Sequence, residues 1–220
     1  MEPLWAPLGG SWGLLGTSWS LLEAWEQLGL AQCSVFRGGF TLEAAEAVID
    51  VNAWPEAPWP IDVVQSLLDK CLLRVWEPYA GHRRFYLLQS VHAYAEEKLG
   101  TVAEFTTPHG IALGGADMER HVASRHASYY SRLGLDESVD ALELRSGLPH
   151  RRAVAFEVDN LLAAVEGVAV YDQPTVAARC ARAAMRILQR TGPFQRALNL
   201  FGSVGAMERV APPERARLLF

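Results

Sequence analysis

The histidines could supply metal ligands, and two of them, His121 and His126, fall in one stretch with helical spacing. Residues five positions apart lie about 140° apart around an α-helix, so these two imidazoles do not share one face. A zinc site needs several nitrogen, sulfur or oxygen ligands that converge on one point. The pair therefore predicts no metal site.

Enzymatic chemistry has little support in the residue pattern. Serine, histidine and aspartate are all present, but no nucleophile elbow and no spaced pair of carboxylates brings them together. The sequence also contains no Gly-x-x-x-x-Gly-Lys-Ser/Thr motif, whose backbone amides and lysine would cradle nucleotide phosphates. We expect this chain to be no enzyme on its own and to hold no cofactor.

Basic residues gather at two places where they could contact a partner. His82, Arg83 and Arg84 fall at a predicted turn, which is either a solvated tip or a contact for an acidic surface. Four arginines at three- and four-residue steps form a stripe on a predicted helix. This stripe is either a solvated face or a docking surface for an acidic partner or the neighbouring helix pair. Its members are Arg179, Arg182, Arg186 and Arg190.

The segment Phe36-Arg37-Gly38-Gly39-Phe40 predicts a corner between two helices. A glycine at this point allows the left-handed backbone that commonly ends a helix. Phe36 and Phe40 flank the turn, and we expect both rings to anchor it in one core. The corner formed by Phe36, Gly38, Gly39 and Phe40 is therefore structural and carries no chemistry of its own.

The pattern around this corner predicts a small module over residues 17–100, preceded by an irregular segment at 1–16. The module has helical spacing of apolar residues in four stretches and a pair of β-rich stretches joined by turn residues. In order, the predicted elements are a helix over 21–36, a helix from Leu42 capped by Thr41, a helix over 61–70 after Pro60, a β-hairpin of 73–76 and 84–88, and a helix over 91–99 closed by Gly100. Three helices followed by a hairpin indicate a winged-helix domain.

Residues 101–117 contain several glycines and no sustained period, which predicts a linker. Helical patterns follow at 118–133, 152–170, 175–189 and 194–209, separated by glycine and proline breaks. Helices joined by short turns are typical of stacked helical hairpins, although no clean internal repeat is visible. The predicted fold class is therefore mainly α, with a helical-repeat region over 118–220 that we expect to continue past its last residue.

The composition fits a globular protein and gives no general attraction to polyanions, since half of the 220 residues are hydrophobic and the net charge is −5. Cys33, Cys71 and Cys180 are an odd, widely spaced set, which predicts buried free thiols in a reducing cytoplasm. The first residues are apolar but lack basic residues and are broken by glycine and proline. This pattern argues against a signal peptide and a membrane helix, so we expect a cytoplasmic location.

Several blocks of the sequence carry a resemblance that periodicity alone does not. They are Ser18-Trp19-Ser20-Leu21-Leu22, Trp25-Glu26-Gln27, Ser34-Val35-Phe36-Arg37-Gly38-Gly39-Phe40, the run from Leu67 to Leu73, the run from Phe85 to Ala95, the run from Arg125 to Tyr130, and the run from Glu157 to Ala164. In order and spacing they resemble the winged helix and the tetratricopeptide-like sensor region behind the nucleotide-binding core of bacterial STAND (NB-ARC-like) signal-transduction ATPases. The resemblance implies a regulatory half that packs on such a core, in cis or in trans, and relays a signal through its repeats.

The resemblance also bears on ligand contact. Some members of that family place a histidine before the fourth helix, where it touches the bound diphosphate. This chain has Leu88 at the equivalent position, so that contact is absent. His92, one turn later, stands where many bacterial members have arginine, which makes it a candidate contact to a partner domain.

A winged-helix DNA-binding transcriptional regulator is the alternative. Binding to DNA phosphates needs lysine or arginine, whereas Asp62 and Asp69 lie on the outer face of the third predicted helix. Lys70 and the arginines of the turn remain as candidate phosphate contacts. The charge pattern disfavours DNA binding without removing it from consideration.

Overall fold

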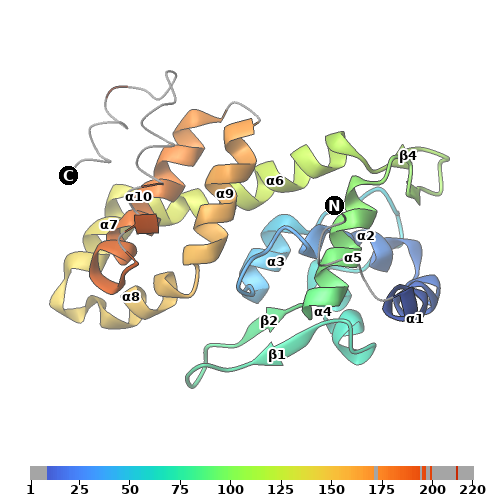
Figure 1. The fold of residues 1–220 in the computed structure, drawn as a ribbon, viewed down its shortest axis with the longest axis horizontal. Helices are drawn as coiled ribbons and strands as arrows, with labels where there is room; N and C mark the ends of the chain where they lie inside the picture. Colours follow the sequence, from blue (N-terminus) through green and yellow to red (C-terminus); the bar gives the residue numbers. More distant parts are fainter. Residues whose placement is uncertain (1–8, 171–172, 194, 197–198, 200–211, 213–220) are drawn as a thin grey trace. The chain divides into compact units, whose positions relative to one another are not determined.

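The computed structural model describes residues 9–170 and 173–193, together with 195, 196, 199 and 212, and is mainly helical (Figure 1). The expected mainly α fold class is therefore confirmed. The chain divides into two compact units. The first unit comprises Met1–Ser34 and Thr41–Glu119, and the second comprises Val35–Phe40 and Arg120–Phe220.

The first unit contains five complete helices among its described residues and two short hairpins. The helices are α1 (Gly9–Ser20), α2 (Ala24–Cys33), α3 (Leu42–Val48), α4 (Pro60–Asp69) and α5 (Gln89–Gly100). Thr41 caps α3, since its Oγ1 accepts a hydrogen bond from the Ala44 amide over 3.3 Å. Pro60 opens α4, where its fixed φ suits the first helical turn. These two helix starts confirm the predictions from the sequence.

The helix α1 covers part of the segment that was expected to be irregular. Four glycines within it weaken the intrinsic tendency to form a helix, which explains the expectation. The structure supplies an anchor at the end of the helix: Trp19 is buried, and its ring forms a T-shaped pair with Tyr94 at 5.6 Å between centroids. Burial of this indole ring outweighs the low helix propensity of the glycines.

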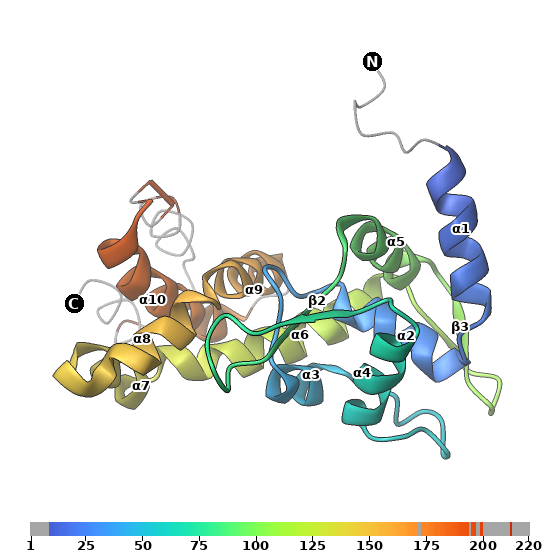
Figure 2. The ribbon, with the colours of Figure 1, turned by 90° about the horizontal axis from the view of Figure 1, so that it is seen from below.

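The core of the first unit forms where α2 packs against α4 and α5 (Figures 1 and 2). Gly29 allows α2 and α4 to approach closely, because a Cβ at this position would lie 2.6 Å from Val63 Cγ1. Leu28, Val63 and Leu67 are almost completely buried. The apolar stripes that predicted these helices therefore face one another.

The predicted hairpin is confirmed in β1 (Arg74–Trp76) and β2 (Arg84–Tyr86), which pair antiparallel with Val75 opposite Phe85. A second hairpin, β3 (Phe105–Thr106) with β4 (Ala112–Leu113), lies in the stretch expected to be a linker. Buried Phe105 anchors it. Strands of two residues are too short to show an alternating pattern, so they could not be predicted from the sequence.

The helices of the second unit begin within α6 (Ala116–Ser131), which crosses the division between Glu119 and Arg120. The 3₁₀ turn η1 (Arg132–Gly134), α7 (Asp136–Glu143), the 3₁₀ turn η2 (Arg145–Gly147), α8 (Leu148–Ala155), α9 (Val158–Val170) and α10 (Pro174–Thr191) follow. The two long helices α9 and α10 pack side by side (Figures 1 and 2).

Two details of this unit differ from the prediction. The expected helix over 152–170 is two helices, α8 and α9, separated at Phe156 and Glu157. Helix α7 was not predicted, because eight residues with four acidic side chains give only a weak apolar stripe. The expected helix over 194–209 lies largely outside the described residues.

Cys33 and Cys180 are buried free thiols, as expected, whereas Cys71 is exposed and has a φ of 58°. Cys71 follows the end of α4 in a left-handed turn, which takes its side chain off the buried face of the helix. Burial raises the pKa of the Cys33 thiol to about 12 and also raises that of Cys180. Across the described part of the chain, no helix combines the length and apolar character needed to cross a membrane.

Candidate interaction site

The corner segment Val35–Phe40 belongs to the second unit, although the residues on either side of it belong to the first. Gly38 and Gly39 both have positive φ, at 74° and 87°, which confirms the left-handed backbone predicted for this turn. The rings of Phe36 and Phe40 stack on each other, with 4.2 Å between centroids and 21° between planes. Both side chains are buried, so the rings anchor the turn as expected.

Asn160, in α9, holds the backbone of this segment. Its Oδ1 accepts a hydrogen bond from the Arg37 amide over 2.7 Å, and its Nδ2 donates one to the Gly39 carbonyl over 2.8 Å. The second Nδ2 hydrogen is donated to the carboxylate of Glu157, also over 2.8 Å. Asn160 is completely buried. Its amide therefore fixes a loop that lies more than 120 residues earlier in the chain.

His126 and Tyr130 of α6 complete the surroundings of the corner. The rings of His126 and Phe36 form a T-shaped pair with 5.4 Å between centroids, and Tyr130 lies 4.7 Å from His126 between centroids. His126 Nε2 lies 3.5 Å from Asn160 Oδ1. Since that oxygen accepts, the neutral tautomer with hydrogen on Nε2 fits the contact.

Burial is the main reason that the pKa of His126 falls from 6.5 to about 4. The contact with Asn160 raises this pKa, and the charge of Arg37 lowers it further. The imidazole is therefore neutral near pH 7. The side chains around the corner hold its backbone turn in place by hydrogen bonding and aromatic packing.

Sequence reasoning identified the corner but missed its partners in the second unit. Asn160 stands in the apolar run Asn160-Leu161-Leu162-Ala163-Ala164 of α9, and a polar amide on the buried side of such a run is a sign of a specific hydrogen-bonding role. The sequence pattern offered His126 as a candidate metal ligand and as part of the family resemblance, but not as a partner of the corner. Among the described residues, no group of three His, Cys, Asp or Glu side chains is placed to hold a metal ion.

Only some of the residues predicted to contact a partner at the first hairpin lie on its surface. Arg83 is exposed, but Arg84 is completely buried on β2, so the expectation of a solvated tip is wrong for Arg84. Arg83 precedes β2, whereas Arg84 and Phe85 within this strand are both buried. The His82 ring stacks on Tyr79, with 4.6 Å between centroids and 9° between planes. His92 is half-buried, and its Nδ1 lies 3.8 Å from the Glu96 carboxylate.

The arginine stripe of α10 is in part used inside the second unit. Arg182 donates to the Gly134 carbonyl over 3.1 Å and pairs with Asp136, while Arg190 pairs with Glu143. These partners belong to η1 and to α7, which was not predicted. Contact with a neighbouring helix, one of the alternatives for the stripe, thus applies to two of its members. Arg179 and Arg186 are half-buried.

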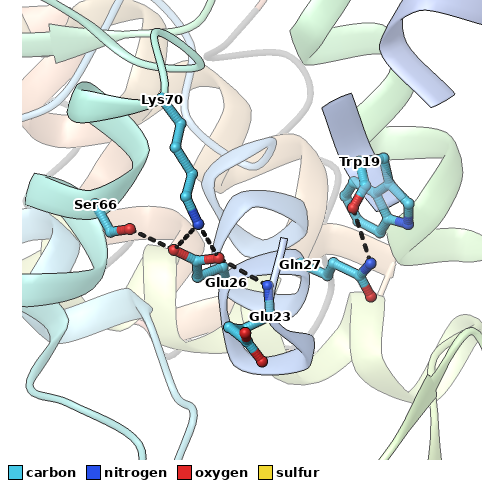
Figure 3. A network of polar contacts seen from close by, with 6 residues as sticks. All are labelled: Trp19, Glu23, Glu26, Gln27, Ser66 and Lys70. Carbon is cyan, nitrogen blue, oxygen red and sulfur yellow. Dashed lines mark hydrogen bonds and ion pairs between the residues drawn. The ribbon is translucent and has the colours of Figure 1, made fainter. Parts of the chain in front are cut away.

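A buried carboxylate organises the first unit, and sequence reasoning missed it (Figure 3). Glu26 is 1% exposed, and its carboxylate accepts hydrogen bonds from Lys70 Nζ over 2.6 Å, from Ser66 Oγ and from the Glu23 amide over 2.7 Å. The last bond is half of a capping box at the start of α2. Gln27 donates to the Trp19 carbonyl over 3.0 Å in the same region.

This network affects both a pKa and the surface charge of α4. Burial raises the pKa of Glu26, but the bonds from Lys70, Ser66 and Glu23 together outweigh it, and the net pKa is lowered. Lys70 is held by Glu26, and Gln65 donates to Asp69 over 2.8 Å. The outer side of α4 therefore retains its acidic residues while its lysine is neutralised.

Comparison with known proteins gives one limited similarity. No family model and no solved structure matches the sequence. The chain is 33% identical over 150 residues to predicted HTH-type transcriptional regulators of Mycobacterium bovis and of two strains of Mycobacterium tuberculosis. The match covers 66% of this chain and 14% of the length of each relative.

Proposed function

We propose that this chain is a non-catalytic regulatory and protein-interaction segment of a STAND-type signalling ATPase. In this proposal the first unit is a winged-helix module, and the second is the beginning of a tetratricopeptide-like repeat region. The partner is a nucleotide-binding ATPase core, in cis or in trans. The similarity to proteins of which the matched region is only 14% agrees with a role inside a much larger regulator.

This proposal rests on which segments of the chain make up the second unit. The unit includes Val35–Phe40, whose two neighbours in the chain, Ser34 and Thr41, belong to the first unit. Asn160 binds the backbone of that segment on both sides of Gly38. A signal that shifts α9 or α6 therefore acts directly on the connection between α2 and α3, which suits a relay.

The test is ATP hydrolysis by a nucleotide-binding core encoded in the same or the neighbouring reading frame. We expect this chain to change the turnover of the core by about fivefold or more, the range of ordinary allosteric coupling. Asn160→Ala should remove most of that change. Gln173→Ala serves as the matched control, since Gln173 donates to Ser124 elsewhere in the second unit. Equal turnover with and without the chain would argue against the proposal.

DNA binding is the second candidate, because the relatives are named as HTH-type regulators. Those names describe whole proteins, so the DNA-binding part can lie outside the matched 14%. Lys70 is engaged by Glu26 and Arg84 is buried, which leaves Arg83 of the three basic residues considered from the sequence. This distribution of charge favours the interaction segment.

A mobility shift on duplex DNA at increasing salt separates the two candidates. The interaction segment should give at most weak retention that disappears with salt. Retention that survives physiological salt and falls in Arg83→Ala would favour the DNA-binding regulator instead.

A further inference from the structure

We infer that the segment Val35–Phe40 is a latch that opens while both units stay folded, and that Asn160 is the side chain that holds it closed. Its use in relaying a signal rests on the function proposed above. Its opening is a property of this chain alone and can be measured without any partner.

The first support is the way the segment is fastened. Asn160 binds two backbone groups, the Arg37 amide and the Gly39 carbonyl, and these lie on either side of Gly38. The two bonds use one hydrogen and the oxygen of the same amide group. Loss of this single side chain therefore removes polar contacts at both halves of the turn together.

The second support is that each flanking helix end has a capping bond from a side chain outside the segment. Ser34 Oγ donates to the Ala31 carbonyl over 2.6 Å, at the end of α2. Thr41 Oγ1 accepts from the Ala44 amide at the start of α3. Both bonds lie inside the first unit, so departure of the segment leaves these caps intact.

The third support is the pair of glycines in the middle of the segment. Gly38 and Gly39 both have positive φ, and neither carries a Cβ that restricts the backbone to one region. Gly38 is also exposed, with Asp159 as the neighbour of an added Cβ, at 3.3 Å from Oδ2. Two adjacent glycines between two aromatic anchors form a hinge at which the segment can leave its site.

Amide hydrogen exchange of the whole chain tests the latch, because the Arg37 amide is itself a bond of the closed state. In the wild type this amide should exchange at least about tenfold faster than the amide of buried Ala184 in α10, since local opening needs less free energy than global unfolding. Asn160→Ala should speed exchange at Arg37 by a further factor of about ten and change Ala184 by less than about threefold. Gln173→Ala is the control and should leave Arg37 unchanged.

A second variant changes the segment itself instead of Asn160. Gly38→Ala strains the closed turn at its φ of 74° and should also speed exchange at Arg37. Gly81→Ala is its matched control, since Gly81 has a φ of 79° and open space around it. Exchange at Arg37 as slow as at Ala184 in the wild type, equal acceleration at both amides, or no acceleration in either variant would overturn the latch. If the latch opens but the chain does not change ATP hydrolysis by the nucleotide-binding core, this inference stands and the proposed function is refuted.

Discussion

At the scale of single residues, the charge state of His126 depends on the fold. It is buried against Phe36 and Tyr130, and its pKa is about 4, compared with 6.5 for an ordinary histidine. A histidine with a lowered pKa stabilises the fold while it stays neutral. This contribution is fully present above pH 6.5 and is lost as the pH falls from 6.5 towards 4.

We therefore predict that the second unit loses roughly 3 kcal/mol of unfolding free energy between pH 6.5 and 4 because of His126. His126→Gln should remove most of this pH dependence, since glutamine keeps an N–H donor for Asn160 but does not take up a proton. Urea unfolding followed by far-UV circular dichroism at several pH values measures the effect.

His121→Gln is the control for this prediction, because His121 is exposed on the same helix. It should leave the pH dependence as in the wild type. All seven tryptophans lie between residues 5 and 76, so tryptophan fluorescence follows the first unit separately. An unchanged slope in His126→Gln would contradict the assignment.

The carboxylate of Glu26 gives a second prediction for a single site. Lys70→Met leaves this buried charge without its cation and should lower the stability of the first unit by about 2 kcal/mol, a discounted figure because the Lys70 side chain is 39% exposed. Urea unfolding followed by tryptophan fluorescence measures the loss. The double variant Glu26→Gln, Lys70→Met should recover part of it. If the losses in the single variants Glu26→Gln and Lys70→Met simply add in the double variant, the pair does not interact.

The pKa of Glu26 sets the window for its own pH dependence. Because this pKa is lowered in the folded state, the contribution is present above the ordinary value of 4.5 and is lost as the pH falls through the folded value. Acid destabilisation of the first unit by Glu26 thus begins near pH 4.5, at the acid end of the range in which His126 acts on the second.

At the scale of elements, the approach of α2 to α4 depends on Gly29. Gly29→Ala brings a Cβ to 2.6 Å from Val63 Cγ1 and should lower the stability of the first unit by about 1–3 kcal/mol. Val63→Ala in the same chain should restore part of the loss by making room. Gly13→Ala, in α1 with no atom within 4 Å of the added Cβ, should instead be neutral or stabilise by up to about 1 kcal/mol. Destabilisation by Gly13→Ala of the same size would remove the steric explanation.

Elements with a strong local signal could be predicted from the sequence. Helix α4 has Pro60 at its start and a clear apolar stripe, α3 has the Thr41 cap, and the first hairpin has β-rich stretches around a turn. Elements of few residues, such as β3, β4 and α7, could not, because their patterns do not extend over a full period. Helix α1 depends on burial of Trp19, which is a tertiary contact that propensity does not register.

For a similar reason, only the corner of the candidate site could be predicted, and its partners could not. The corner has a local signature of glycines between aromatic residues, whereas its partners lie on helices far along the chain. Contacts such as that of Asn160 with Arg37 follow from the packing of the whole unit, and local sequence patterns do not reveal which distant residues meet. The same applies to Glu26 and Lys70, which are 44 residues apart.

At the scale of the whole molecule, a substitution in the corner should be felt in the second unit. Phe40 is completely buried, so Phe40→Ala should lower the stability of that unit by about 3–5 kcal/mol. Far-UV circular dichroism should show the loss, and thermal unfolding should begin earlier. Leu21→Ala, at a side chain that is 74% exposed, should change stability by less than about 0.5 kcal/mol. Retained thermal stability of Phe40→Ala would count against the role of the corner.

The discontinuous second unit has a consequence for synthesis of the chain on the ribosome. Asn160 is made 120 residues after Phe40, and at about 5–20 residues per second this interval lasts roughly 6–24 s. For part of that time the rings of Phe36 and Phe40 lie outside the ribosome before α9 is available. The nascent chain therefore displays a short aromatic segment that chaperones can bind, and folding of the second unit ends this exposure only after α9 has been made.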